Sequence, residues 1–159
     1  MRGHLLAIAV WVGIVAAGYF LFEHFTAPPP VSRAVGDGVS EISVPVARDG
    51  HYYLDGAVNG QPIRFMVDTG ASYVSVGAGF ARSAGLPEGI PGYFSTANGT
   101  VEGRLVKNQR VRADLFEVSG LTVAVMPAAG EQGLLGQNFL RNFEILQING
   151  TLVLRLRRQ

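Results

Sequence analysis

The chain contains no cysteine and only three histidines among its 159 residues. Without cysteine, a disulfide scaffold, a thiolate zinc site and a cysteine nucleophile are all excluded. His4 and His24 flank an apolar N-terminal stretch, so His51 alone is left for a folded domain. A site with several histidine ligands to a metal is therefore excluded, and a Ser/His/Asp triad would depend on His51. The chain also lacks the nucleophile-elbow spacing of a serine hydrolase.

The chain also lacks an excess of basic or of acidic residues. Thirteen Lys and Arg stand against 12 Asp and Glu, a net charge of +1. This provides no basic field with which to bind nucleic acid, so that class of partner is excluded. Hydrophobic residues make up 48% of the chain, which excludes a disordered tail, and 21 Gly with 8 Pro indicate many tight turns. The length fits one domain with an appendage, and the composition favours strands over helices.

The N-terminus carries an uncharged run of 18 residues, Leu5 to Phe22, about long enough to cross a bilayer as a helix. A cleavable signal peptide has a shorter apolar stretch and a small-residue cleavage site. Here aromatic residues continue the run, and the candidate cleavage site at Ala27 is followed by Pro28. We therefore favour an uncleaved single-pass anchor over residues 1–25. Arg2 before the helix weakly places the N-terminus in the cytoplasm. The rest then lies on the periplasmic or extracytoplasmic side of the inner membrane.

Small residues recur every four positions in this helix, at Ala9, Gly13 and Ala17. The spacing lets two membrane helices approach closely, although small residues are common in any membrane helix. Residues 26–40 begin Pro-rich and end with Gly and Ser, which is typical of a partly extended linker. The folded domain is expected to occupy residues 41–159.

Asn-Gly dipeptides organise this domain, because both residues of a two-residue hairpin turn take positive φ. They predict hairpins around Asn59-Gly60, Asn98-Gly99 and Asn149-Gly150, and Ser119-Gly120 likewise separates two strand-like runs. Helical signal is limited to 78–84, with Gly85 as a stop, and to a turn or two in 137–142. The pattern predicts an all-β or mostly-β domain.

Several polar positions are interpreted as ordinary surface. Asp49, Asp55 and Asp114 lie beside turns or on alternating strands and are expected to be solvated. Tyr52 and Tyr53 are expected to pack in the core and at an edge, with contact of one of them to a substrate groove as the alternative. The basic residues at the end of the chain fit the solvated side of an end strand, with contact to anionic lipid as the alternative; they are Arg155, Arg157 and Arg158.

The informative stretch is Phe65-Met-Val-Asp-Thr-Gly-Ala-Ser-Tyr-Val74, in which an apolar strand delivers an acid into a tight turn. Burying a carboxylate at a strand end costs free energy unless it is hydrogen-bonded or shares a proton. Asp68 therefore requires an explanation. In isolation, such an Asp commonly accepts hydrogen bonds from the backbone of its own turn.

A second motif, Gly133-Leu-Leu-Gly-Gln-Asn-Phe-Leu140, lies beyond the Asn98-Gly99 hairpin. In this order and spacing the two motifs resemble the retropepsin-like aspartic proteases, and in particular a bacterial membrane-anchored branch. The resemblance covers roughly residues 51–156. It implies an acid-protease half-barrel, one lobe per chain, with one or two short helices.

The resemblance assigns roles to individual residues. Asp68 is the implied catalytic carboxylate, and Thr69 is expected to bond across to a partner turn. Gly70 lets the chain pass close to the substrate backbone. The implied substrate-binding residues are Ala71 beside the catalytic turn, Gly136 packed against it, and the tip of a flap at Ala97, Asn98 and Gly99.

The chain has one Asp-Thr-Gly, whereas the mechanism of this family needs two carboxylates. The resemblance therefore implies a homodimeric endopeptidase that acts on a peptide or protein substrate, in which each chain gives one Asp68 and the pair shares a proton. No metal or organic cofactor is implied. A non-catalytic, membrane-tethered binding module of the same fold is the alternative.

The turn departs from related enzymes at three positions. Ala71 offers no hydroxyl to the carboxylate, so we expect an activity optimum nearer neutral pH than in pepsin-like enzymes. Ser72 and Gln137 replace an Asp and an Arg that pair near the dimer interface of the viral enzymes. A neutral contact is consistent with the loss of both charges together.

Overall fold

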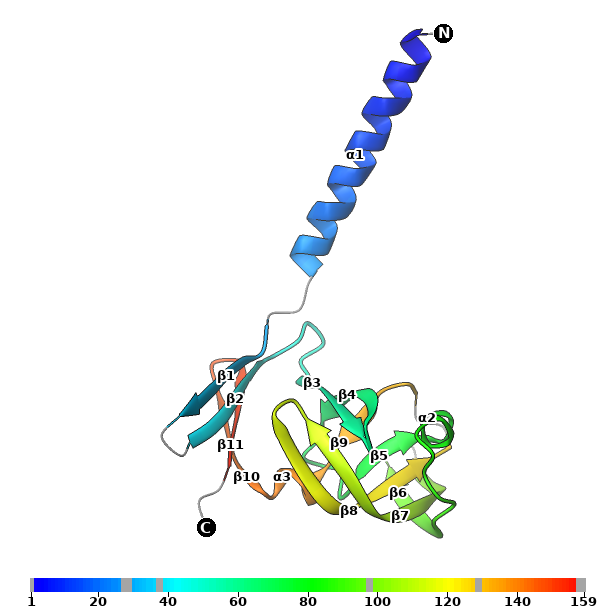
Figure 1. Cartoon of the computed structure of the whole chain (residues 1–159), viewed down its shortest axis with the longest axis vertical. Coiled ribbons are helices and arrows are strands. Elements are labelled where there is room, and N and C mark those ends of the chain that lie inside the picture. The colour runs from blue at the N-terminus through cyan, green and yellow to red at the C-terminus, as the bar shows by residue number, and fades with distance from the viewer. Residues whose placement is uncertain (1, 27–29, 37–38, 97–98, 128–129, 157–159) are drawn as a thin grey trace.

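The computed structural model of the chain describes residues 2–26, 30–36, 39–96, 99–127 and 130–156. A long N-terminal helix leads into a domain made mostly of strands, as the sequence predicted (Figure 1). The helices are α1 (Arg2–Thr26), α2 (Ala78–Ser83) and α3 (Gln137–Leu140). The strands are β1 (Ser32–Gly36), β2 (Val39–Pro45), β3 (Tyr53–Val58), β4 (Gln61–Val67), β5 (Val74–Gly77), β6 (Ile90–Thr96), β7 (Gly99–Ala113), β8 (Phe116–Met126), β9 (Gly133–Leu135), β10 (Phe143–Ile148) and β11 (Thr151–Leu156).

Helix α1 presents apolar side chains around its whole circumference. The segment Ile8–Phe25 has a mean hydropathy of 1.6 over 18 residues and none of it is buried against the rest of the chain. Large side chains such as Trp11 and Phe25 stay 67% and 72% exposed, which is unfavourable in water. By length and composition this helix suits a membrane span or a signal sequence.

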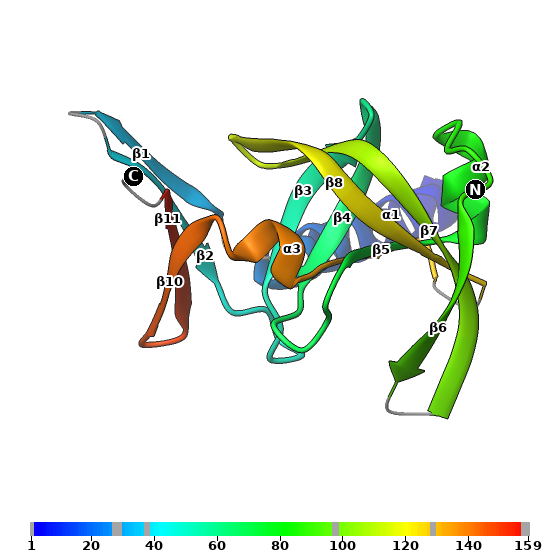
Figure 2. The ribbon, with the colours of Figure 1, turned by 90° about the horizontal axis from the view of Figure 1, so that it is seen from below.

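The Asp-Thr-Gly motif is carried by a seven-stranded sheet with the order β3-β4-β9-β5-β8-β7-β6. An additional pairing between β3 and β7 closes six of these strands into a barrel and leaves β6 outside it, where, within the described ranges, it pairs with β7 alone. The strands β4 and β9 run parallel, as do β5 and β8. The β6–β7 hairpin therefore extends beyond the barrel (Figure 2).

Two of the predicted Asn-Gly hairpins have the expected geometry. Asn59 and Gly60 have φ of 52° and 89° between β3 and β4. Asn149 and Gly150 have φ of 49° and 73° between β10 and β11. Both predictions are confirmed, as is α2, which ends before Gly85 at a φ of 62°.

The hairpin predicted at Ser119-Gly120 is wrong. Strand β8 continues through this dipeptide, and the chain reverses earlier, at Asp114 with a φ of 52°. Gly120 of β8 has a φ of 75°. It precedes Leu121, which pairs with Gln109 of β7, and the register of the β7–β8 pairing shifts on either side of Gln109. The dipeptide marks a bulge in a long hairpin, because a bulge that places glycine in the left-handed region takes the same positive φ as a turn.

A second, four-stranded sheet has the order β1-β2-β11-β10 and is called the outer sheet below. Its strand β1 and the start of β2 fall within residues 26–40, so that stretch is only partly a linker. Strand β11 is an interior strand, not an end strand, and Arg155 pairs with Glu41 of β2 at 2.8 Å. Arg157 and Arg158 lie outside the described residues.

Asp114 is not the solvated residue that the sequence indicated. Its carboxylate is 6% exposed and accepts two hydrogen bonds from Arg33, at 2.6 and 2.7 Å, which join β1 to the β7–β8 turn. These contacts raise the pKa of the Arg33 guanidinium. The buried carboxylate was missed because its partner comes from the stretch assigned to the linker.

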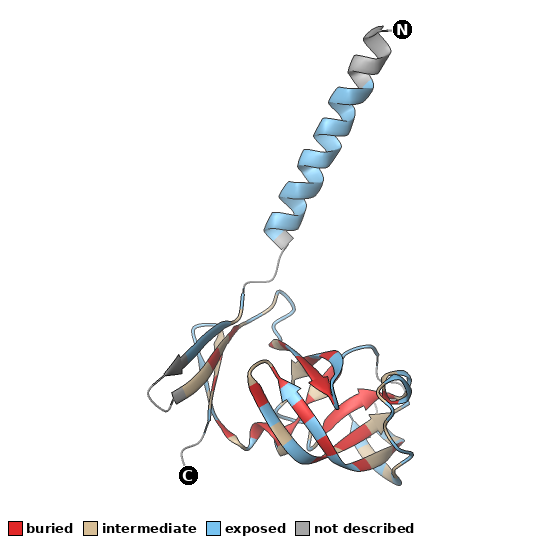
Figure 3. Cartoon of the chain, viewed as in Figure 1, coloured by how far each residue is buried: buried red, intermediate tan, exposed pale blue. Residues whose placement is uncertain are grey.

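One continuous core fills the barrel and continues beneath the outer sheet (Figure 3). Phe143 of β10 stacks on Phe139 of α3, with ring centroids 5.2 Å apart, and contacts Phe116 of β8 at 4.6 Å. Leu135, the last residue of β9, and Leu140, the last residue of α3, are fully buried. This packing fixes α3 and β9 against the strands that carry the Asp-Thr-Gly motif.

Candidate active site

Asp68 follows β4 directly, at the end of a buried parallel strand pair. Val67 pairs with Leu135 of β9, and its N–H donates to the Tyr52 carbonyl at 2.9 Å. The Asp68 N–H donates to the Leu135 carbonyl at 3.2 Å. The backbone is therefore held on both sides, while the Asp68 side chain remains partly exposed.

The Asp68 carboxylate is oriented by its own turn. Its Oδ1 accepts a hydrogen bond from the Gly70 N–H at 2.8 Å, and the Ala71 N–H donates to the Asp68 carbonyl at 3.3 Å. This is the local arrangement that an isolated Asp in a turn adopts. Thr69, Gly70 and Ser72 are exposed, so the turn presents an open face.

Gly136 lies against the backbone of this turn. A Cβ built on Gly136 would lie 2.3 Å from the Tyr73 carbonyl oxygen and 2.8 Å from that of Ala71. Real Cβ atoms essentially never approach so closely, so position 136 admits only glycine unless the backbone moves. The second motif and the Asp68 turn are therefore in direct contact.

The first residues of α3 join the two motifs by hydrogen bonds. The backbone N–H groups of Gln137 and Asn138 donate to the carbonyls of Ala71 and Ser72, at 2.8 and 3.1 Å. The Gln137 side chain donates from Nε2 to the Thr69 carbonyl at 2.9 Å. The Gln137 side chain thus contacts the turn through a neutral amide, at the backbone of Thr69.

Asn138 is a site residue that the sequence analysis did not single out. Its Oδ1 accepts from the Val74 N–H at 2.8 Å, and its Nδ2 donates to the Thr122 carbonyl at 2.7 Å. One side chain therefore ties together α3, β5 and β8. A signal was present, because a polar residue between Gly136 and the apolar Phe139-Leu140 pair needs partners when that helix is buried.

The expected flap corresponds to the β6–β7 hairpin. Ala97 and Asn98 lie outside the described residues, while Gly99 begins β7, is exposed and has a φ of 108°. Tyr93 on β6 is 78% exposed. The free end of this hairpin and the turn between β4 and β5 project from the same side of the barrel (Figure 2).

A partly open cavity lies away from the Asp68 turn. It has a volume of about 340 Å³ and lies between the outer sheet and the barrel, and no residue of the Asp68 turn lines it; its lining includes Val31, Arg33, Tyr53, Arg64 and Asp114. Among the described residues, no group of three or more His, Asp or Glu could hold a metal ion. The exposed Asp68 turn is thus separate from this cavity.

The fold and this turn match those of the retropepsin-like aspartic proteases. A solved structure titled as a retropepsin-like aspartic protease from Rickettsia conorii matches with a TM-score of 0.57 and 26% identity, over 80% of this chain and 96% of that one. The family model described as "gag-polyprotein putative aspartyl protease" matches residues 54–142. Since this is more than half of the chain, the protein belongs to that family.

Two curated relatives are each 32% identical to this chain. One is an uncharacterized protein of Rickettsia prowazekii, RP867, aligned over 112 residues that cover 62% of this chain and 48% of that protein. The other, from a Sinorhizobium species, is an uncharacterized protein in the cobV 5′ region, aligned over 126 residues that cover 76% of this chain and 53% of that protein. The chain thus spans about half the length of the curated relatives that it matches.

Proposed function

We propose that the chain is a membrane-anchored, homodimeric aspartic endopeptidase in which two Asp68 carboxylates, one from each chain, activate water. The observation that carries this proposal is the Asp68 turn. Its carboxylate is fixed by the Gly70 N–H, its backbone is joined to α3, and its open face is free to meet a second copy. Family and fold agree with this chemistry.

The proposed reaction needs the two carboxylates in different protonation states. Two close carboxylates cannot both ionise cheaply, so the pair holds one proton between them. The ionised Asp68 takes a proton from a water molecule as the water oxygen attacks the scissile carbonyl carbon. The protonated Asp68 of the other chain donates its proton to the carbonyl oxygen. The resulting gem-diol collapses as the C–N bond breaks: the first Asp68, now protonated, gives its proton to the leaving amine nitrogen, and a hydroxyl of the diol returns a proton to the other Asp68. No covalent enzyme intermediate forms.

Dimer formation is part of the proposal because one chain supplies one carboxylate. In the proposed dimer, Thr69 bonds across to the partner turn, Gly70 and Ala71 lie beside the substrate backbone, and the hairpin tip with Gly99 covers it. The exposure of Thr69 and Gly70 supports this arrangement. Anchoring in one membrane raises the effective concentration of the two chains, so a weak dimer of the domain can still be active.

The membrane anchor is the proposed role of α1. At about 1.5 Å rise per residue, the apolar segment Ile8–Phe25 spans about 27 Å, close to the hydrocarbon thickness of a bilayer. Arg2 favours a cytoplasmic N-terminus, so the protease domain is proposed to lie on the extracytoplasmic side of the inner membrane.

The test is peptide cleavage by the full chain in vesicles. A diverse peptide mixture is incubated from pH 3 to pH 8 with the wild type and with Asp68→Asn, and the products are identified by mass spectrometry. The proposal predicts cuts that disappear in Asp68→Asn, and mixed wild-type and variant dimers should be inactive as well. No cuts from chains shown by cross-linking to be dimeric would overturn it and favour the binding module.

A further inference from the structure

The outer sheet has one end that lies close to the anchor. Ser32 begins β1 and pairs with Ser43 of β2, while Thr151, which begins β11, pairs with both Pro45 of β2 and Ile148 of β10. The Val46 N–H donates to the Gly150 carbonyl at 2.7 Å, which brings the 46–52 loop to the same end. The membrane-facing edge is defined here as Val46, Arg48, Ile148 and the Asn149-Gly150 turn.

Chain length restricts how the domain can be oriented. Six peptide units join Thr26, the last residue of α1, to Ser32, and they reach at most about 20 Å. A domain of about 130 residues has a radius of gyration of about 14 Å, which corresponds to a diameter of about 35 Å. The tether is therefore shorter than the domain, so the end that carries Ser32 must stay near the point where α1 leaves the bilayer.

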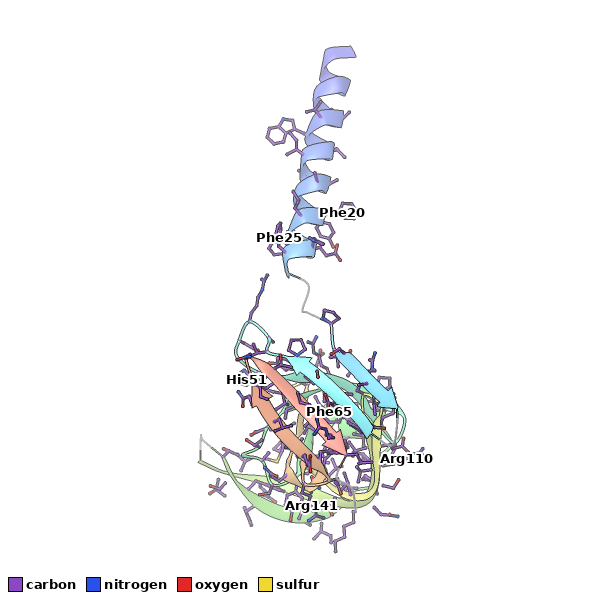
Figure 4. All side chains as sticks on the ribbon, turned by 90° about the vertical axis from the view of Figure 1, so that its left-hand side faces the viewer. Phe20, Phe25, His51, Phe65, Arg110 and Arg141 are labelled. Atoms are coloured by element: carbon purple, nitrogen blue, oxygen red, sulfur yellow. The ribbon has the colours of Figure 1, made fainter. Side chains whose placement is uncertain are left out.

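A direct contact supports this orientation. The Arg48 guanidinium, from the 46–52 loop, donates a hydrogen bond to the carbonyl oxygen of Phe25 in the last turn of α1. A cation near a helix C-terminus satisfies a carbonyl that has no partner within the helix. Figure 4 shows His51 at the end of the domain that faces α1, and Arg141 at the opposite end.

The side chains of this edge suit the boundary between lipid headgroups and acyl chains. Ile148 is 56% exposed and Val46 is 37% exposed, next to the exposed cation of Arg48. Apolar side chains beside a long basic one are the combination that binds a bilayer interface. The acidic neighbour Asp49 is engaged by the Tyr53 hydroxyl at 2.6 Å and by the His51 N–H at 3.0 Å. Farther along the outer sheet, a charged row formed by Glu144, Arg155 and Glu41 is less suited to lipid.

We infer that the membrane-facing edge docks on the surface of the same bilayer that holds α1. This inference rests on the proposed anchoring by α1 and is independent of catalysis. The loop that carries Arg48 leads through Tyr52, whose carbonyl accepts from the Val67 N–H, to the start of the Asp68 turn. Docking therefore fixes the catalytic turn on the membrane side of the domain, within reach of peptide segments presented at the bilayer surface.

The absence of cysteine makes the test direct, because each labelled variant carries a single thiol. Ile148→Cys, Leu156→Cys and Ile14→Cys are made in the full chain, labelled with an environment-sensitive fluorophore and reconstituted in vesicles that contain lipid-borne quenchers. Leu156 is the matched control: it is 50% exposed and lies at the other end of β11, five residues and about 17 Å from Thr151. Ile14 reports the anchor itself.

The inference predicts loss of fluorescence at positions 14 and 148 and none at 156. Adding Arg48→Glu should restore the fluorescence at 148 and leave that at 14 quenched. If the label at position 14 is quenched and the label at position 148 is exposed to water, the docking inference is overturned and the proposed anchoring by α1 is retained. No quenching at 14 overturns both. Equal quenching at 148 and 156, or a label at 148 that is shielded from water without lipid quenching, assigns this edge to another contact and overturns the inference as well.

Discussion

Replacing Gly136 by Ala should disturb the Asp68 turn more than any comparable exchange of a glycine on the surface. The added Cβ would lie 2.3 Å from the Tyr73 carbonyl oxygen, whereas ordinary van der Waals contact begins at about 3.4 Å. The difference is about 1.1 Å, and the clashing atoms belong to the backbone, so no rotamer change relieves the overlap. Overpacking of this kind costs about 1–3 kcal/mol. For a domain of this size that lowers the melting temperature by about 3–12 °C.

The same displacement should reduce activity beyond the loss of stability. A shift of about 1 Å in a catalytic group can cost about 100-fold in rate, so kcat/KM for any cleaved peptide should fall by about that factor at a temperature where the variant is folded. Gly79→Ala is the control, because its Cβ would meet only the end of the Arg82 side chain, at 4.0 Å. Thermal unfolding followed by circular dichroism and peptide cleavage measure the two effects. If Gly136→Ala melts and cleaves like Gly79→Ala, the packing argument is refuted.

Three other changes probe the supports around the site. Asn138→Leu leaves the Val74 N–H and the Thr122 carbonyl without their partner, so the free energy of unfolding measured by urea denaturation should fall by about 2–5 kcal/mol. The control Gln147→Leu changes an exposed side chain and should leave this free energy unchanged. Equal urea midpoints for the two variants would contradict the assigned hydrogen bonds. Arg33→Met removes the partner of the buried Asp114 carboxylate. Relative to the wild type, hydrogen exchange of the β1 amides should become faster, and that of the β10 amides should change less. Unchanged exchange in β1 would show that β1 is held by β2 alone. The Tyr53 hydroxyl is the main cause that lowers the pKa of Asp49, followed by the His51 N–H. A carboxyl whose pKa is lowered by folding stabilises the fold at pH values above its unfolded-state pKa, near 3.9, and loses that contribution as the pH falls through its folded-state pKa. Tyr53→Phe should therefore raise the pKa of Asp49 in an NMR titration, and a constant pKa would refute the assignment.

Local rules were sufficient where one dipeptide decides the geometry. Asn59-Gly60 and Asn149-Gly150 form hairpins because both residues must take positive φ, and the structure has them so. The rule is wrong at Ser119-Gly120, because a bulge opposite Gln109 needs the same backbone conformation as a turn. Only the pairing partner across the sheet distinguishes the two cases.

Long-range partners explain the other differences. Strand β1 was assigned to a linker because residues 26–40 begin Pro-rich and end with Gly and Ser, yet it gains a partner in β2, and its Arg33 forms an ion pair with Asp114, 81 residues away. The contacts of Gly136 with Tyr73 and of Asn138 with Thr122 are likewise set by how β9 and α3 pack. The two motifs therefore contain the residues of the candidate site, but the sequence did not single out Asn138, and the tertiary fold determined which of them touch.

The supports of the Asp68 turn are neutral, and this affects how the pH dependence of the enzyme can be interpreted. Gln137, Asn138 and the backbone of residues 68–74 are joined by amide and carbonyl hydrogen bonds, and among the described residues no ion pair involves them. Amides do not titrate between pH 3 and pH 8, so acid does not remove these contacts one by one, as it would remove a carboxylate–guanidinium pair. The position of Asp68 on the scaffold should therefore be constant across that range. For the proposed dimer, a change in cleavage rate with pH is then expected to report the proton shared by the two carboxylates, and not a loosening of the turn that holds them.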